Sequence, residues 1–175
     1  MKNYYKKTLF IIAGLSVIGA SFFFSKSNIV EAAIKDGEKF GDWNVSCVKN
    51  NNKKQLCFLA QQVTTTKDDK AQIVAAYQIG YFGKDKKLNM TQILPLGLNL
   101  LLGTSIISSE KLIAPGKFTT CIASGCFALA EISNQDLETL LSSTNNAIGF
   151  INAEGKQINL PISTKGLKEG LAALK

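Results

Sequence analysis

Residues 40–60 read FGDWNVSCVKNNNKKQLCFLA and predict a β-hairpin. In the first half of this stretch Trp43, Val45 and Cys47 share one face, and the polar residues between them face the other way. A period of two is typical of a half-buried strand. A polar, Asn-rich turn follows, and the apolar run after it returns as a second strand with Cys57 opposite the first cysteine. We expect Trp43 to anchor the core beside this cysteine pair, with a ligand platform as the alternative.

The same alternation continues along most of the chain and indicates a mainly β domain. In residues 72–82 the side chains of Ile73, Ala75, Tyr77, Ile79 and Tyr81 share one parity. A polar turn precedes this strand at residues 64–70, and another follows it at residues 83–87. Further strands are expected at residues 104–108, 117–123, 127–132, 147–152 and 156–161. We therefore expect residues 33–175 to form a single antiparallel β-sandwich or barrel-like domain with two short helices, the second at the C-terminus.

Five leucines share one parity in residues 94–102. This pattern predicts one apolar sheet face that belongs to the core. Pro95 and Gly97 fall on the opposite parity, where they suggest a sheet edge or a β-bulge, and the alternative is that they line a groove.

Two helices are expected among the strands. Residues 133–136 read SNQD, the S-x-x-D form of a capping box, and leucines at helical spacing follow. Near the C-terminus Leu167, Leu171 and Leu174 form an i, i+4, i+7 stripe. We expect this stripe to pack against the sheet, and a membrane-binding amphipathic helix is the alternative.

Residues 1–32 have the features of a secretory signal peptide. Three lysines precede an uncharged apolar run at residues 8–24, and Val30 and Ala32 stand at the −3 and −1 positions of a cut after Ala32. An uncleaved anchor is the alternative, because the run reaches the short end of a bilayer span. Removal of this leader takes away four lysines and one glutamate, so the formal charge falls from +7 to +4. We expect an exported protein in the periplasm, at the cell surface or secreted, with no stable membrane span after leader removal.

The chain has four cysteines: Cys47, Cys57, Cys121 and Cys126. An even number of cysteines in an exported protein predicts disulfides. We expect the pairs 47–57 and 121–126, because each pair lies close in sequence and each can close a hairpin. The second hairpin would have a four-residue loop with Gly125 at positive φ. A zinc site is the alternative, but the C-x9-C and C-x4-C spacings do not match tight zinc knuckles.

All 20 basic residues are lysines, and the chain has neither arginine nor histidine. Catalytic triads, dyads and metal sites that use histidine are therefore excluded, as is bidentate arginine binding of phosphate. Some weaker candidates for catalytic groups remain: the carboxylates of Asp68 and Asp69 in a Lys-flanked turn, Lys111 near Ser108 and Ser109, and Lys165 near Ser163.

Several ordered motifs resemble the invasion-associated locus B family. They are FGDWNVSC at residues 40–47, KQLCFL at 54–59, LPLGL at 94–98, TCIASGC at 120–126, LP at 160–161, KGL at 165–167 and LAAL at 171–174. The resemblance implies an exported bacterial protein with a signal peptide and paired cysteines, from a family named after a locus implicated in host-cell invasion. It implies no defined catalytic residues. This chain departs from the family pattern in its lack of arginine and in a Lys-rich closing helix that contains Gly170.

These observations favour a noncatalytic exported envelope protein, a binding or accessory factor linked to host-cell invasion. We expect no cofactor and no metal, and a partner that is an unknown protein or a host-surface macromolecule. Nucleic acid is not expected, because arginine and a clustered basic stripe are both missing. The alternative is a small periplasmic hydrolase that uses carboxylates or a Ser–Lys pair. A pocket with converging carboxylates or a buried lysine beside a serine would favour the enzyme, and an exposed apolar patch would favour binding.

Overall fold

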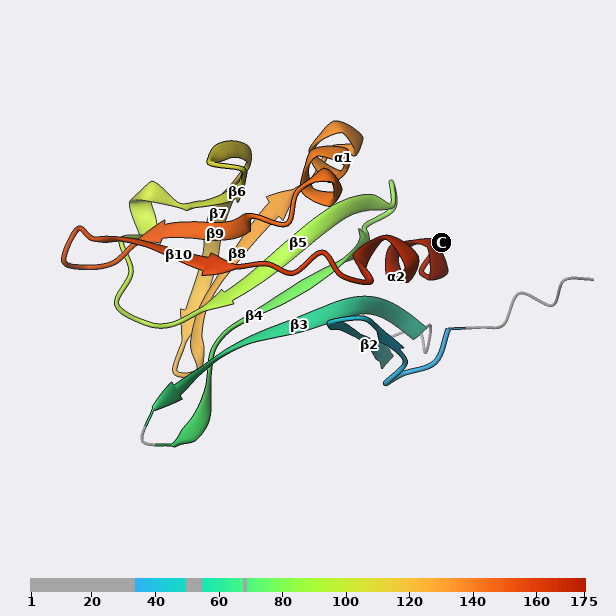
Figure 1. Ribbon diagram of the computed structural model, residues 1–175, viewed down its shortest axis with the longest axis horizontal. Coiled ribbons are helices and arrows are strands. Elements are labelled where there is room, and N and C mark those ends of the chain that lie inside the picture. Colours follow the sequence, from blue (N-terminus) through green and yellow to red (C-terminus); the bar gives the residue numbers. More distant parts are fainter. Residues whose placement is uncertain (1–33, 50–54, 68) are drawn as a thin grey trace, which may run out of the picture. The chain divides into compact units, whose positions relative to one another are not determined.

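Ten antiparallel strands form one continuous sheet in the computed structural model, which describes residues 34–49, 55–67 and 69–175 (Figure 1). The order across the sheet is β1-β2-β3-β4-β5-β8-β7-β6-β9-β10, so the edge strands β1 and β10 do not pair and the sheet is not closed. The strands are β1 (Lys39–Phe40), β2 (Trp43–Lys49), β3 (Gln55–Lys67), β4 (Lys70–Phe82), β5 (Lys87–Leu94), β6 (Thr104–Ser108), β7 (Lys111–Ile122), β8 (Gly125–Glu131), β9 (Asn146–Ile151) and β10 (Gln157–Pro161). The predicted leader, residues 1–32, lies outside the described residues.

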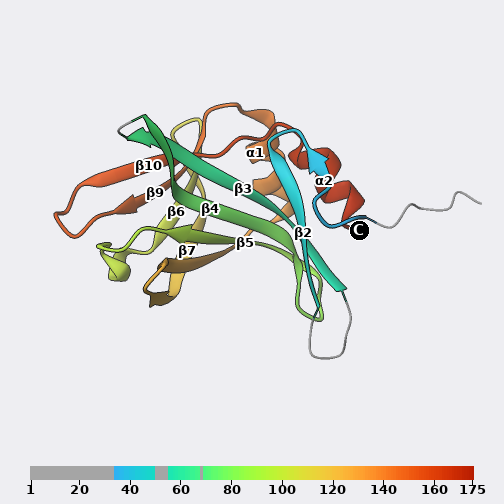
Figure 2. The same ribbon diagram turned by 90° about the horizontal axis from the view of Figure 1, so that it is seen from below.

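Side chains from both halves of the sheet meet in one hydrophobic core. Trp43, Leu59 and Tyr77 come from β2, β3 and β4, while Ile106 and Ile148 come from β6 and β9, and all five are completely buried. In Figure 2, β9 and β10 lie behind β3 and β4. Burial of a large apolar side chain stabilises the fold by about 1.5–3 kcal/mol. The prediction of a mainly antiparallel β domain with two short helices is confirmed, and the core position of Trp43 is confirmed with it.

Side-chain hydrogen bonds connect the two ends of this open sheet. The indole Nε1 of Trp43 donates to the carbonyl oxygen of Ser163 at 2.9 Å, and Gln61 Oε1 accepts from the Ser163 amide at 3.0 Å. The hydroxyl of Tyr77 donates to the carbonyl oxygen of Leu160 at 3.4 Å. The chain at the end of β10 is thus held by side chains of β2, β3 and β4, without a backbone ladder between β1 and β10.

Two helices cover parts of the sheet. In α1 (Asn134–Ser142) the hydroxyl of Ser133 accepts from the amide of Asp136 at 3.1 Å, and Asp136 Oδ2 accepts from the amide of Ser133 at 3.0 Å, which confirms the capping box. In α2 (Leu167–Ala173) Leu167 and Leu171 are buried in the same core as the strands, which confirms that the leucine stripe packs against the sheet.

The hairpin of β3 and β4 is longer than predicted. The sequence indicated a turn over residues 64–70, but β3 continues to Lys67 and β4 begins at Lys70, since β-branched threonines favour strand. A β-bulge shifts the register between Val63 and Thr64. Ile73 lies beyond this bulge and is 59% exposed, so the prediction that it shares the inward face of Tyr77 was wrong.

The prediction that the leucines of residues 94–102 form one apolar sheet face was also wrong. β5 ends at Leu94, which is buried, and the next residues form a loop and the 3-10 helix η1 (Leu100–Leu102). Pro95 has no N–H to continue the ladder, and Gly97 turns the chain with a φ of +81°. Both residues therefore lie in this exposed loop, at neither a strand edge nor a bulge.

The tip of the β7–β8 hairpin is tighter than predicted. β7 ends at Ile122 and β8 begins at Gly125, which pairs with Ile122, so only Ala123 and Ser124 form the turn. Gly125 has a φ of +144°, and a Cβ atom there would lie 2.5 Å from the carbonyl oxygen of Leu94. The glycine thus serves a close approach to β5 as well as the turn.

Candidate functional site

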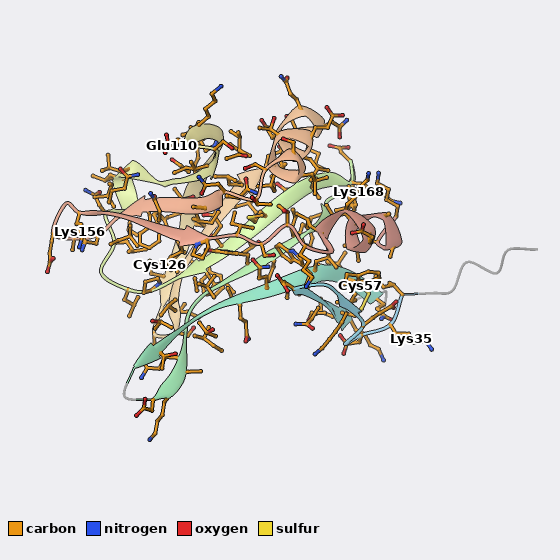
Figure 3. All side chains as sticks on the ribbon, viewed as in Figure 1. Lys35, Cys57, Glu110, Cys126, Lys156 and Lys168 are labelled. Carbon is orange, nitrogen blue, oxygen red and sulfur yellow. A yellow bond between two sulfur atoms is a disulfide. The ribbon has the colours of Figure 1, made fainter. Side chains whose placement is uncertain are left out.

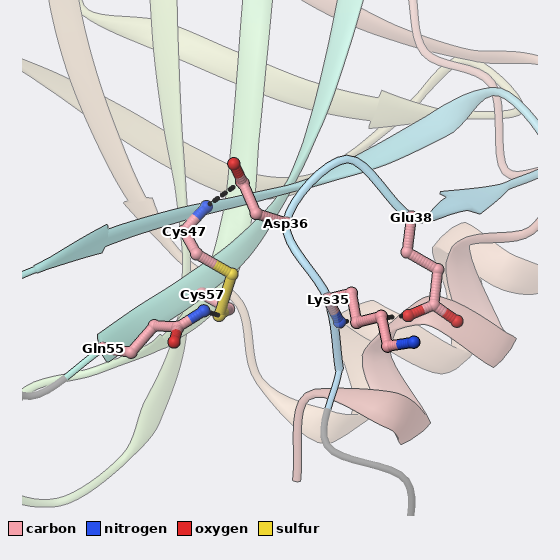
Figure 4. Close-up of a disulfide and its surroundings, with 6 residues drawn as sticks. All are labelled: Lys35, Asp36, Glu38, Cys47, Gln55 and Cys57. Atoms are coloured by element: carbon pink, nitrogen blue, oxygen red, sulfur yellow. Dashed lines mark hydrogen bonds between the residues drawn. A yellow bond between two sulfur atoms is a disulfide. The ribbon is translucent and has the colours of Figure 1, made fainter.

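Both predicted disulfides are present. Cys47–Cys57 joins β2 to β3 and Cys121–Cys126 joins β7 to β8, each between residues directly opposite in the ladder with 4.0 Å between Cα atoms. Figure 4 shows the first disulfide, where the amide of Cys47 donates to Asp36 Oδ1 at 2.8 Å. No free cysteine occurs among the described residues. The pairing 47–57 and 121–126 is therefore confirmed, and all four sulfur atoms are in disulfides.

One predicted Ser–Lys group lies in a cleft between β6, β7 and α1. The cleft has a volume of about 510 Å³ and is rich in hydroxyl groups. Ser109 Oγ lies 2.9 Å from Ser143 Oγ, and the buried Ser108 hydroxyl donates to the carbonyl oxygen of Thr139 at 3.3 Å. The side chain of Lys111 lines the cleft but is exposed, and within the described residues its amine makes no hydrogen bond to either serine.

The other predicted Ser–Lys pair lies at the junction of β10 and α2. The Ser163 hydroxyl donates to Asp42 Oδ2 at 2.6 Å and accepts from the backbone amide of Lys165 at 3.2 Å. The Lys165 side chain is exposed. The serine hydroxyl therefore connects two chain segments, and it donates its proton to a carboxylate.

Only one carboxylate of the predicted pair lies in the described part of the chain. Asp69 is exposed in the β3–β4 turn with a φ of +58°, and Asp68 lies outside the described residues. Among residues 34–49, 55–67 and 69–175, no group of three or more Cys, Asp or Glu side chains lies close enough to hold a metal ion. The one ion pair found there joins exposed Lys87 to Glu131 at 2.7 Å, and this carboxylate raises the lysine pKa through its hydrogen bond and its charge.

The loop after β5 exposes a group of leucines. We call it the leucine knob; its members are Leu96, Leu100, Leu101 and Leu102. Leu101 is 98% exposed, although backbone bonds hold the loop in place: the amide of Asn99 donates to Ile151 at 2.9 Å, and the amide of Ala153 donates to Gly97 at 2.8 Å. The knob is thus a fixed projection beside the β9–β10 hairpin, whose turn carries Lys156 (Figure 3).

The sequence signal for the knob is an absence of charge, since residues 88–109 contain no charged side chain. The parity of the leucines suggested a sheet face instead. Only the turn at Pro95 and Gly97 places these leucines in solvent.

The motifs that support the family resemblance meet in two places. We call the first the clasp, formed by residues 40–43 and 163–166. In it the amide of Asp42 donates to the carbonyl oxygen of Lys165 at 3.1 Å, and Gly41 and Gly166 allow the two backbones to touch. The second place is the end of β5, where Leu94 pairs with Cys126. The roles of Ser163 and Gln61 in this arrangement could not be predicted, since a contact between residues 102 apart has no local signal in the sequence.

No helix in the described part of the chain is both long and apolar enough to cross a membrane. The short helices α1 and α2 instead contribute leucines to the core.

Comparison with known proteins agrees with these motifs. The family described as "Invasion associated locus B (IalB) protein" matches residues 43–175. Invasion protein B homologs from two strains of Brucella abortus are each 24% identical over 135 residues, covering 77% of this chain and 76% of the relative. The crystal structure of invasion associated protein b from Bartonella henselae is similar in fold, with a TM-score of 0.67 and 18% identity over 78% of this chain and 92% of that chain. The chain therefore belongs to the invasion-associated locus B (IalB) family.

Proposed function

We propose that this IalB family member is an exported, noncatalytic envelope protein that binds another macromolecule, a protein or a host-surface component, in the setting of host-cell invasion. The observation that carries the proposal is the leucine knob. A contiguous group of exposed apolar side chains is typical of an interaction site, because solvation of this surface is unfavourable until a partner covers it. The two disulfides support export, since disulfides persist in oxidising compartments. The names of the Brucella relatives support the link to invasion.

Serine substitution in the knob tests this role. In a Leu101→Ser/Leu102→Ser variant, cross-linking pull-down from intact cells, with and without host membranes, is expected to lose the partner that the wild type captures. Leu112→Ser is the matched control, because Leu112 is also exposed (61%) but lies on β7. Both variants should melt within a few degrees of the wild type, since these side chains are outside the core. Undiminished capture by the knob variant would refute the proposed surface.

Export has its own test. If the leader is cleaved after Ala32, the intact mass of the protein from the periplasmic fraction should correspond to residues 33–175. A full-length species that fractionates only with the inner membrane would contradict cleavage.

A small periplasmic hydrolase is the second candidate function, and the hydroxyl-rich cleft of Ser108, Ser109 and Lys111 favours it. Lys111 would have to accept the proton of a serine. A fluorophosphonate probe should then label Ser109, and Ser109→Ala should abolish labelling while Ser124→Ala, a change in an exposed turn, preserves it. Absence of labelling in the folded protein would count against a serine hydrolase.

A further inference from the structure

β4 is longer than the strand that pairs with it on one side. β5 pairs with β4 from Lys87, opposite Phe82, to Ile93, opposite Ala76. Residues 70–73 and 75 of β4 pair with β3, and Val74 is the extra residue of the β-bulge. On their other edge residues 70–75 have no backbone partner within the described residues. In Figure 1 this end of the β3–β4 hairpin projects below the end of β5. The free edge presents unpaired backbone donors and acceptors to solvent.

The gap beside this edge exists because β5 stops. Pro95 follows Leu94 immediately and cannot donate the next ladder hydrogen bond, and Gly97 then turns the chain away. The β7–β8 turn closes the far side of the gap, since Leu94 pairs with Cys126 and a Cβ at Gly125 would contact the Leu94 carbonyl. The space in line with β5 is therefore bounded on both sides by backbone that the fold holds in place.

A groove of about 360 Å³ lies at the same position. Its lining comes from β4, the end of β5 and the β7–β8 turn: Ile73, Val74, Ala75, Ala76, Ile93, Leu94, Pro95 and Ser124. None of these side chains carries a charge, so a charged side chain in the groove would lose water without gaining a counter-ion. The groove thus fits an apolar side chain.

We propose that this edge of β4 binds an extended, uncharged segment of a partner protein as an additional antiparallel or parallel strand in line with β5. Unpaired main-chain groups of a strand are satisfied in a regular pattern by the main chain of another extended polypeptide, while a pocket beside the edge selects a side chain. The six free residues of β4 would pair with a segment about 20 Å long, at about 3.3 Å per residue. This site is separate from the leucine knob and from the function proposed for it.

A synthetic peptide, acetyl-TVTITV-amide, is the probe for this site. Added to the disulfide-bonded protein, it should shift the amide NMR signals of residues 70–76, 93 and 94. It should also slow hydrogen exchange at those amides of residues 70–75 that face the free edge, which alternate with the amides that face β3. The same peptide N-methylated at alternate residues keeps its side chains but loses the backbone N–H groups of the methylated residues. It should therefore bind at least tenfold more weakly. Equal binding of the two peptides, or NMR shifts confined to other residues, would overturn the proposal. This comparison needs no substitution in the protein.

Charge substitution provides the second arm. Ile73→Lys should weaken peptide binding at least tenfold, whereas Leu112→Lys should not, because the two residues are equally exposed (59% and 61%) but only Ile73 lines the groove. Equal affinity of the two variants would overturn the proposal. A dimer of the unliganded protein that Ile73→Lys dissociates in sedimentation would assign the edge to a second copy, which also overturns it. Peptide binding by Leu101→Ser/Leu102→Ser should be unchanged, so failure here and failure of the knob are distinguishable.

Discussion

Tyr77 brings a hydroxyl group into the core of the domain. Its side chain is completely buried, and the hydroxyl donates to the Leu160 carbonyl across the interior. Burial raises the Tyr77 pKa above its ordinary value of 10.0, because the phenolate would lose its hydration. One side chain therefore connects β4 to β10 and makes the stability of the fold dependent on pH.

The free energy of unfolding should fall as the pH rises above 10. In that range the tyrosine ionises in the unfolded chain but stays protonated in the folded one, which removes up to about 1.4 kcal/mol per pH unit. Tyr77→Phe should lose this part of the pH dependence. Urea unfolding of the wild type and the variant at pH 8, 10 and 11 measures the difference. The same decline in both proteins would show that Tyr77 does not cause it.

At the scale of elements, the two disulfides act on hairpins that the backbone already pairs. Cys47–Cys57 and Cys121–Cys126 each join directly opposite residues of adjacent strands and are 10 and 5 residues apart in sequence. A cross-link that closes such short loops restricts the unfolded chain more than it changes the native one. Each bond therefore stabilises one hairpin locally.

Loss of either bond should cost about 2–3 kcal/mol, and slightly less for the shorter loop. Denaturant unfolding of Cys47→Ala/Cys57→Ala and Cys121→Ala/Cys126→Ala measures the two costs separately. Both double variants should keep the far-UV circular dichroism of the wild type in the absence of denaturant. An unchanged unfolding midpoint in either one would contradict a stabilising role for that disulfide.

At the scale of the whole domain, the clasp holds together two ends of the chain that no strand pairing connects. Asp42 and Ser163 are 121 residues apart in sequence but share a hydrogen bond of 2.6 Å. Gly166 contacts the carbonyl oxygen of Phe40 so closely that a Cβ atom would overlap it. Since β1 and β10 do not pair with each other, this junction and α2 connect the two edges of the open sheet.

Gly166→Ala should separate the clasp and cost about 2–5 kcal/mol, from a strained φ of +80° together with the overlap. Gly155→Ala is the control, because Gly155 has the same φ of +80° but open space around it, and it should cost only about 1–2 kcal/mol. Thermal and urea unfolding of the two variants compare the costs. Equal losses would show that the backbone contact at the clasp contributes nothing.

Local patterns in the sequence determined the β class, the first hairpin, both disulfide pairs, the capping box of α1 and the packing of α2. Each depends on residues that are close in sequence, so side-chain period and spacing are sufficient. The leucine run at residues 94–102 shows the limit. Its parity matches a strand, but Pro95 and Gly97 turn the chain and expose four of its leucines. Parity describes which side chains share a face only while the backbone stays extended.

Tertiary structure alone decided the features that depend on distant segments. The clasp needs residues 40–43 and 163–166 in contact, and the groove beside β4 needs the end of β5 and the β7–β8 turn at one position. Ile73 has the apolar side chain of a core residue but is exposed, because it lies beyond the β-bulge in a part of β4 that extends past β5. A side chain is buried only if other residues pack against it. Strand order decides which residues these are, and the side-chain period of a single strand carries no information about strand order.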